Sequence, residues 1–213
     1  MLAVLVATVS VGCGGSGQAP LGPEHVTDRE RAADRERANE RPERYRLVMP
    51  DRVVHERYER EYDVSAPDET LAELMEGQVD GAEPVFGVYK LAGRGKFSDG
   101  SITVTGVYGV VLSPVTARDE LLDVLDRRDL VQRVLVAPRT ITPPGSEEPL
   151  LCRVVERGYE EDEYTSMSAS CAWAEASTVV TVATLVKSPP SEDELDAFAA
   201  VAGAMRDDVR VGY

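Results

Sequence analysis

The sequence predicts an α+β domain, in which a mostly antiparallel sheet carries about three packed helices. Two observations support this fold class. Apolar, β-branched runs follow one another across short polar connections, as they do in successive β-hairpins. Helical patterns stand between some of these runs instead of alternating with every one of them. The 213 residues, 43% of them hydrophobic, can bury one ordinary core, so we expect a single domain over residues 45–213.

The domain is expected to open with an extended segment over residues 45–54, followed by a short helix over residues 67–76. Pro67 suits an early helical position, where its missing N–H costs nothing. Gly77 and Gly81 should end the helix. The residues expected to face the core are Leu71, Leu74 and Met75.

A hairpin is expected next, formed by residues 84–92 and 101–112 on either side of a polar, glycine-containing connection. Gly106 and Gly109 lie inside the second strand, where glycine marks a close approach of backbone or a bulge. Residues 114–128 then predict a helix, because apolar side chains recur at helical spacing. Those side chains are Ala117, Leu121, Leu122 and Leu125.

The second half of the domain predicts a short strand over residues 131–136 and a proline-containing loop over residues 137–149. Three further strands are expected over residues 150–156, 165–174 and 177–186. The final helix should begin at Ser191, because Ser191 and Glu194 have the spacing of a capping box. Its expected inward residues are Leu195, Phe198, Ala202 and Met205.

Residues 1–12 predict a signal peptide, because their apolar run is too short to span a hydrocarbon core of ~30 Å. The residues before Cys13 resemble the lipobox of bacterial lipoproteins, although Ser10 stands where leucine is usual and no basic residue precedes the run. Cys13 is therefore the expected lipidation site, carrying palmitate-like acyl chains that anchor the protein to the outer face of the cell membrane. The alternative is a plain secretory signal with an incidental cysteine.

Residues 13–44 are expected to form a lipidated cysteine followed by a flexible, charged tether. Residues 24–46 contain seven acidic and seven basic side chains, with no apolar face that could join a core. These charges cancel, so the net charge of −15 falls on residues 47–213. An acidic domain of this kind would be repelled by phosphate backbones, which argues against a nucleic-acid partner.

The two remaining cysteines, Cys152 and Cys171, would face each other if their strands pair as a hairpin, and export would allow them to form a disulfide. Trp173 would then share a strand face with Cys171 and could cover the sulfur atoms. Two buried free thiols remain an alternative, as does a redox pair, although the Cys-x-x-Cys spacing is missing.

No catalytic constellation is evident in the sequence, so we lean against an enzyme. The only histidines are His25, in the tether, and His55, which stands among charged residues. A zinc site would need three or four clustered ligands, so neither a metal nor a cofactor is expected. The stretch from Gly93 to Lys96 lacks the first glycine and the hydroxyl of a phosphate-binding loop and suits a hairpin turn instead.

An acidic run flanked by two tyrosines is expected at a hairpin tip, where it could attract a basic or cationic partner. Its residues are Tyr159, Glu160, Glu161, Asp162, Glu163 and Tyr164. A calcium site is the alternative, but the run lacks the spaced ligands and central glycine of a calcium loop. Paired carboxylates for glycoside hydrolysis also remain open, because spacing in sequence does not give separation in space.

Four segments resemble a group of uncharacterised, Streptomyces-like lipoproteins of actinobacteria, as does the lipobox at Cys13. The segments are Tyr45-Arg-Leu-Val-Met-Pro50, Thr142-Pro-Pro-Gly-Ser146, Cys171-Ala-Trp-Ala-Glu175 and Ser177-Thr-Val179. The resemblance implies export and lipid anchoring but no activity. We expect a membrane-anchored extracytoplasmic binding or adaptor module; the alternatives are a carboxylate-based cell-wall hydrolase and a small-molecule or cation carrier.

Overall fold

The computed structural model describes residues 44–61, 69–94, 100–158 and 165–213, which belong to one compact unit over residues 42–213. The predicted lipidation site at Cys13 and the acidic run over residues 159–164 lie outside the described residues. The described part contains a large antiparallel sheet, three helices and one disulfide, which confirms the predicted α+β class.

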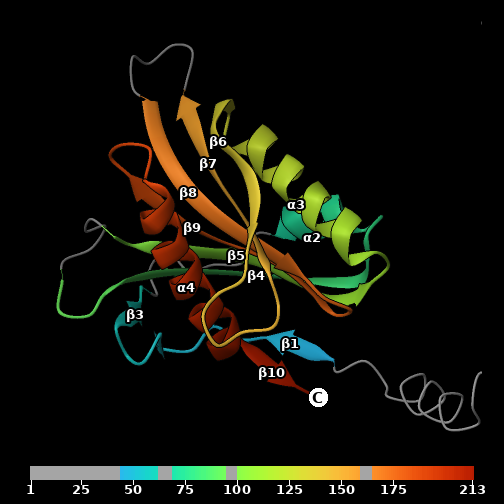
Figure 1. The fold of residues 1–213 in the computed structure, drawn as a ribbon. Helices are drawn as coiled ribbons and strands as arrows, with labels where there is room; N and C mark the ends of the chain where they lie inside the picture. Colours follow the sequence, from blue (N-terminus) through green and yellow to red (C-terminus); the bar gives the residue numbers. More distant parts are fainter. Residues whose placement is uncertain (1–43, 62–68, 95–99, 159–164) are drawn as a thin grey trace, which may run out of the picture. The chain divides into compact units, whose positions relative to one another are not determined.

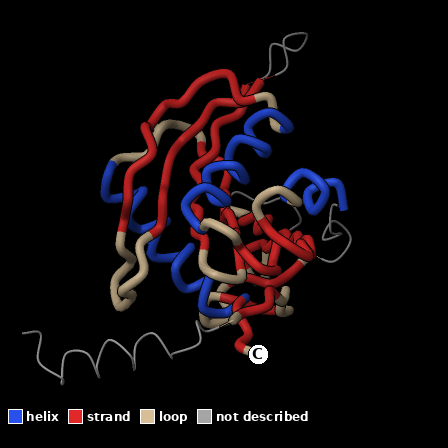
Figure 2. Tube along the Cα trace, turned by 90° about the vertical axis from the view of Figure 1, so that its right-hand side faces the viewer, coloured by secondary structure: helices blue, strands red, loops and turns tan. Residues whose placement is uncertain are grey.

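Eight strands form the main sheet (Figure 1). In spatial order they are β2 (Arg52–Val53), β3 (Tyr58–Arg60), β4 (Val79–Leu91), β5 (Ile102–Val111), β9 (Thr178–Val186), β8 (Thr165–Ala174), β7 (Leu150–Gly158) and β6 (Val131–Ile141). All neighbouring strands pair antiparallel, and Figure 2 shows how strongly they curve along their length. A separate ribbon joins β1 (Tyr45–Leu47) to β10 (Arg210–Gly212).

The three helices cover both faces of the sheet. Helix α4 (Glu192–Val209) packs on one face, in a cluster that includes Val180 and Val182 of β9. Helices α2 (Glu69–Met75) and α3 (Pro114–Arg128) pack on the other face, in a cluster that includes Val179 (Figure 1). Because successive residues of a strand point to opposite faces, a nearly continuous apolar strand such as β9 can supply both cores.

Several predicted elements are confirmed with little change. Helix α3 spans the predicted 114–128, β8 spans the predicted 165–174, and β4 and β5 form the predicted hairpin. Helix α4 begins as predicted: the Ser191 hydroxyl accepts from the Glu194 backbone N–H, and the Glu194 carboxylate accepts from the Ser191 backbone N–H. These local signals are reliable because each depends on residues at most four positions apart.

Three predictions were wrong. Strand β6 continues to Ile141, into the predicted loop, because an edge strand tolerates Pro138 and a shifted register. Strand β4 begins at Val79, so Gly81 lies within it at a bulge with φ of 63° instead of ending a helix. Leu74 is exposed, because a seven-residue helix turns only Leu71 and Met75 toward the sheet.

Cys152 and Cys171 lie directly opposite each other on β7 and β8 and form the predicted disulfide. Both are fully buried in the cluster beneath α4, which also contains Trp173. The burial of both sulfurs suits a structural bond, because a redox pair needs access for an attacking thiolate.

Candidate functional site

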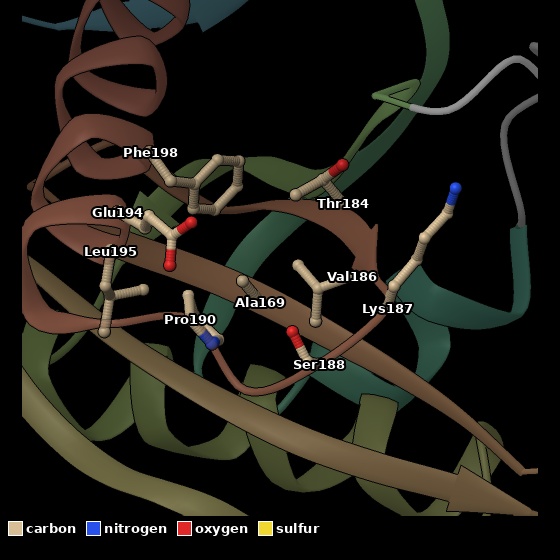
Figure 3. A pocket seen from close by; sticks show the side chains of 9 residues that line it. All are labelled: Ala169, Thr184, Val186, Lys187, Ser188, Pro190, Glu194, Leu195 and Phe198. Atoms are coloured by element: carbon tan, nitrogen blue, oxygen red, sulfur yellow. The ribbon is translucent and has the colours of Figure 1, made fainter.

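A pocket of about 330 Å³ lies between the first half of α4 and strands β8 and β9 (Figure 3). Its lining residues are Ala169, Thr184, Val186, Lys187, Ser188, Pro190, Glu194, Leu195 and Phe198. Its volume is at the small end of the range typical of pockets for small molecules. Polar and apolar atoms both contribute to its surface, so the pocket suits an amphipathic ligand.

The floor of the pocket is open because its strand residues are short. Ala169 of β8 stands opposite Thr184 of β9, and Val186 follows on the same face of β9. One wall comes from α4, where Glu194 and Phe198 are four residues apart and therefore share a face of the helix. Ser188 and Pro190, in the connection between β9 and α4, close the opposite end of the pocket.

Among the described residues, Glu194 is the only acidic one that lines the pocket. Its Oε2 accepts hydrogen bonds from the Ser191 backbone N–H at 2.8 Å and from the Ser191 hydroxyl at 3.0 Å. These bonds, first from the backbone and then from the hydroxyl, lower the pKa of the Glu194 carboxyl. The pocket therefore carries a fixed negative charge, and among the described residues Oε1 has no hydrogen-bond partner.

The other polar groups of the pocket differ in their availability. The Thr184 hydroxyl donates to the Ser101 carbonyl at 2.9 Å, so it faces the pocket only as an acceptor. Figure 3 shows the Glu194 carboxylate and the Ser188 hydroxyl directed toward the space between Ala169 and Pro190. The ammonium group of Lys187 is directed away from them in the same view. The groups that converge on the pocket are mainly hydrogen-bond acceptors.

This arrangement suits binding better than catalysis. General acids need a raised pKa near the working pH, whereas the pKa of Glu194 is lowered. The lining residues that the structure describes include no histidine or cysteine that could pair with Ser188 or Thr184 in nucleophilic catalysis. Within the described ranges, no group of three or more histidine, cysteine or acidic residues is placed to hold a metal ion.

A partly buried ion-pair cluster lies at the other end of α4. Arg206 is 2% exposed, and its guanidinium donates to the Ser146 hydroxyl at 2.6 Å and to the Glu148 carbonyl at 3.2 Å. Arg210 donates to the carboxylates of Glu148 at 3.0 Å and Glu175 at 2.6 Å. Burial raises the pKa of Glu175, and the charge of Arg210 offsets part of that rise.

The same cluster brings together residues of four segments, 45–50, 142–146, 171–175 and 177–179. Tyr45 lies under the Arg210 guanidinium, 4.7 Å from it to the ring centroid, and its backbone N–H donates to the Ser177 hydroxyl at 2.7 Å. Ser146 and Glu175 supply the contacts to Arg206 and Arg210. The segments therefore meet at the end of α4, where they join the loop after β6, the connection between β8 and β9, and strand β1 to that helix.

His55 occupies a left-handed turn between β2 and β3. The φ angles of Val54, His55 and Glu56 are 54°, 54° and 64°, a region that β-branched residues such as valine rarely adopt. The Val54 backbone N–H donates to the Asp208 carboxylate, which joins the turn to α4. His55 itself is exposed.

The pocket was not predicted from the sequence, although two of its residues were assigned other roles there. Phe198 was predicted to face the core, but it is only partly buried and lines the pocket. Glu194 was predicted as a capping residue, which it is. The burial of Arg206 was also missed, although its position four residues after Ala202 places it on the buried stripe of α4.

Comparison of this chain with protein-family models, with curated proteins and with solved structures finds no match in any of the three. No helix in the described ranges is long and apolar enough to cross a membrane.

Proposed function

We propose that this chain is a lipoprotein held at the extracytoplasmic face of the cell membrane through Cys13, and that its domain is a non-catalytic binding module. The observation that carries the proposal is the apolar run of residues 1–12, which ends in small residues directly before Cys13. A stable membrane anchor needs more than one acyl chain or a second membrane-binding signal, and a cysteine that carries more than one acyl chain meets this need.

The disulfide between Cys152 and Cys171 supports the extracytoplasmic part of the proposal. Structural disulfides form and persist in oxidising compartments and are rare where thiols are kept reduced. A buried bond between paired core strands agrees with a protein that folds after export.

The pocket beside α4 supports binding over catalysis, because it joins apolar walls to a carboxylate that stays ionised. A carboxylate-based hydrolase would need a second acid facing the first across a cleft. Glu194 has no such neighbour among the described residues that line the pocket. We also propose the acidic run over residues 159–164 as an attraction site for a basic partner, on the strength of its sequence alone.

The intact mass and membrane partition of the chain test the anchor, with Cys13→Ser beside it in a bacterial host that processes lipoproteins. We expect the wild-type protein to lack residues 1–12, to carry added acyl mass and to pellet with membranes. Cys13→Ser should lose the acyl mass and leave the membrane fraction. An unmodified wild-type protein that fractionates like Cys13→Ser would refute the anchor.

A further inference from the structure

We propose that the pocket between α4 and strands β8 and β9 binds a small organic cation, with its ammonium group between the Glu194 carboxylate and the Phe198 ring. This inference rests on the proposed binding function and names the class of ligand.

The first argument is the pairing of a carboxylate with an aromatic ring. Glu194 and Phe198 lie one turn apart on the same face of α4, and both line the pocket. Figure 3 shows the two side chains next to each other above Ala169 and Val186. A carboxylate attracts a cation by its charge, and the face of an aromatic ring attracts it by its quadrupole. The two groups therefore favour the same kind of ligand at one place.

The second argument concerns the rest of the lining, which selects an organic cation over a metal ion. Val186, Leu195 and Pro190 present apolar surface beside the carboxylate. A hydrated metal ion gains nothing from apolar walls and needs several oxygen ligands, and the described residues of this pocket include only one carboxylate. An alkyl or methyl group on an ammonium gains free energy wherever it removes such surface from water.

The third argument is electrostatic. The N-terminus of α4 carries about half a positive charge, and Lys187 adds a full one, so both oppose a cationic ligand. Against them stand Glu192, Asp193 and Glu194 in the first turn of α4. The ammonium of Lys187 also points away from Glu194 (Figure 3). The local balance is negative, in the same sense as the net charge of −15.

The capping box makes this proposal testable without disturbing the helix. Ser191 holds the Glu194 side chain in place, so the carboxylate is positioned before any ligand arrives. Glutamine can replace glutamate in a capping box. Glu194→Gln therefore removes the charge and keeps the cap, so a change in binding can be separated from a change in folding.

The test uses the full chain with Cys13→Ser, exported and purified with its disulfide intact. Choline is the probe, and 3,3-dimethylbutan-1-ol, which has the same shape without the charge, is its neutral counterpart. Titrations followed by amide chemical shifts should show saturable changes at Val186, Glu194 and Phe198 with choline. The neutral alcohol should bind at least about threefold more weakly, since it lacks the charge that both groups attract.

Three variants complete the test. Glu194→Gln should weaken choline binding about threefold to fivefold, and Phe198→Leu about twofold to fivefold. Glu192→Gln is the matched control: it removes an acid of the same helical turn that does not line the pocket, and it should change the affinity by less than about twofold. Thermal unfolding of each variant checks that the fold is retained.

Equal binding of choline and the alcohol would overturn the proposal, as would equal effects of Glu194→Gln and Glu192→Gln. The absence of any saturable shift with choline would overturn it as well. None of these outcomes bears on the membrane-partition experiment, which does not involve the pocket. The anchor and the cation site can therefore fail independently.

Discussion

At the scale of single residues, the most informative side chains are charged groups that the fold has buried. Arg206 is almost completely enclosed, and the two terminal nitrogens of its guanidinium contact a hydroxyl, a carbonyl and a carboxylate from residues 146–148. A buried arginine without such partners would be strongly destabilising. The loop after β6 is therefore held in place by Arg206, and its prolines add a packing contact where Pro143 approaches Gly203.

Glu175 predicts a pH dependence of stability at the same cluster. Burial raises the folded-state pKa of Glu175 above its ordinary value of 4.5, although Arg210 lowers it. The folded protein thus holds this proton more tightly than the unfolded chain does. The resulting stabilisation is complete below the ordinary pKa and is lost as the pH rises through the raised pKa.

In the wild type, Glu175 should therefore make the free energy of unfolding fall as the pH rises just above 4.5. Glu175→Gln cannot titrate, so this part of the fall should be absent from the variant. Denaturant titrations at a series of pH values measure the slope of unfolding free energy against pH. Glu147→Gln, which removes an exposed carboxylate, serves as the control. Identical slopes for the wild type and Glu175→Gln would contradict the prediction.

Gly106 predicts a steric cost at the centre of the sheet. A Cβ atom there would lie 2.5 Å from the Val179 carbonyl oxygen on the paired strand, too close for any real contact. We expect Gly106→Ala to lower the free energy of unfolding by about 1–3 kcal/mol, as overpacking does in other cores. Gly77→Ala is the control, because a Cβ at Gly77 meets nothing within 4 Å. Equal midpoints of denaturation for the two variants would refute the close approach.

At the scale of elements, the two N-cap serines differ in whether the side chain makes a capping hydrogen bond. Ser191 and Ser113 are the N-cap residues of α4 and α3, but only Ser191 uses its side chain to accept a backbone hydrogen bond. Ser191→Ala should therefore cost about 1 kcal/mol of unfolding free energy. Ser113→Ala should cost clearly less, because it removes no cap bond. Thermal or chemical unfolding of the two variants measures the difference, and equal losses would contradict the assignment of the cap.

The two edge strands of the sheet are poorly suited to pairing with a strand of another chain. Strand β6 is the longer edge strand, and it carries Pro138, three shifts of register and two arginines paired with carboxylates. Proline and irregular register limit the pairing of another chain along an edge. At the other edge, β2 is only two residues long. Both features favour recognition through the pocket over the addition of a strand.

At the scale of the whole molecule, the disulfide is the main covalent constraint on the domain. It closes a segment with a sequence separation of 19, for which loop-closure entropy predicts about 3 kcal/mol of stabilisation. We expect the double variant Cys152→Ala with Cys171→Ala to lose about that amount in urea denaturation. Cys13→Ser is the control, because it leaves the disulfide between Cys152 and Cys171 intact. Its midpoint of urea denaturation should equal that of the wild-type domain without its anchor.

The bond itself is tested by mass spectrometry of tryptic peptides without reduction. The peptides that contain Cys152 and Cys171 should be recovered as one cross-linked species. Recovery of two alkylatable thiols from the native protein would contradict both the bond and the expected loss of stability.

The amino-acid sequence by itself determined the features that depend on near neighbours. The helix over residues 114–128, the cap at Ser191 and the strand over residues 165–174 were read correctly because helix period, capping spacing and β-branched runs are local patterns. The pairing of Cys152 with Cys171 was also predicted, because the two strands are adjacent in the chain and form a hairpin.

Tertiary structure alone decided the features that join distant segments. The pocket combines Ala169 of one strand with Thr184 of the next and Phe198 of a helix, and the cluster around Arg210 combines Tyr45 with Glu175. Strand β6 extends past Pro138 because it lies at the edge of the sheet, where a proline without an N–H breaks no hydrogen bond to a neighbouring strand. Local periodicity records which face of an element is apolar, but twist, register and packing decide which faces meet.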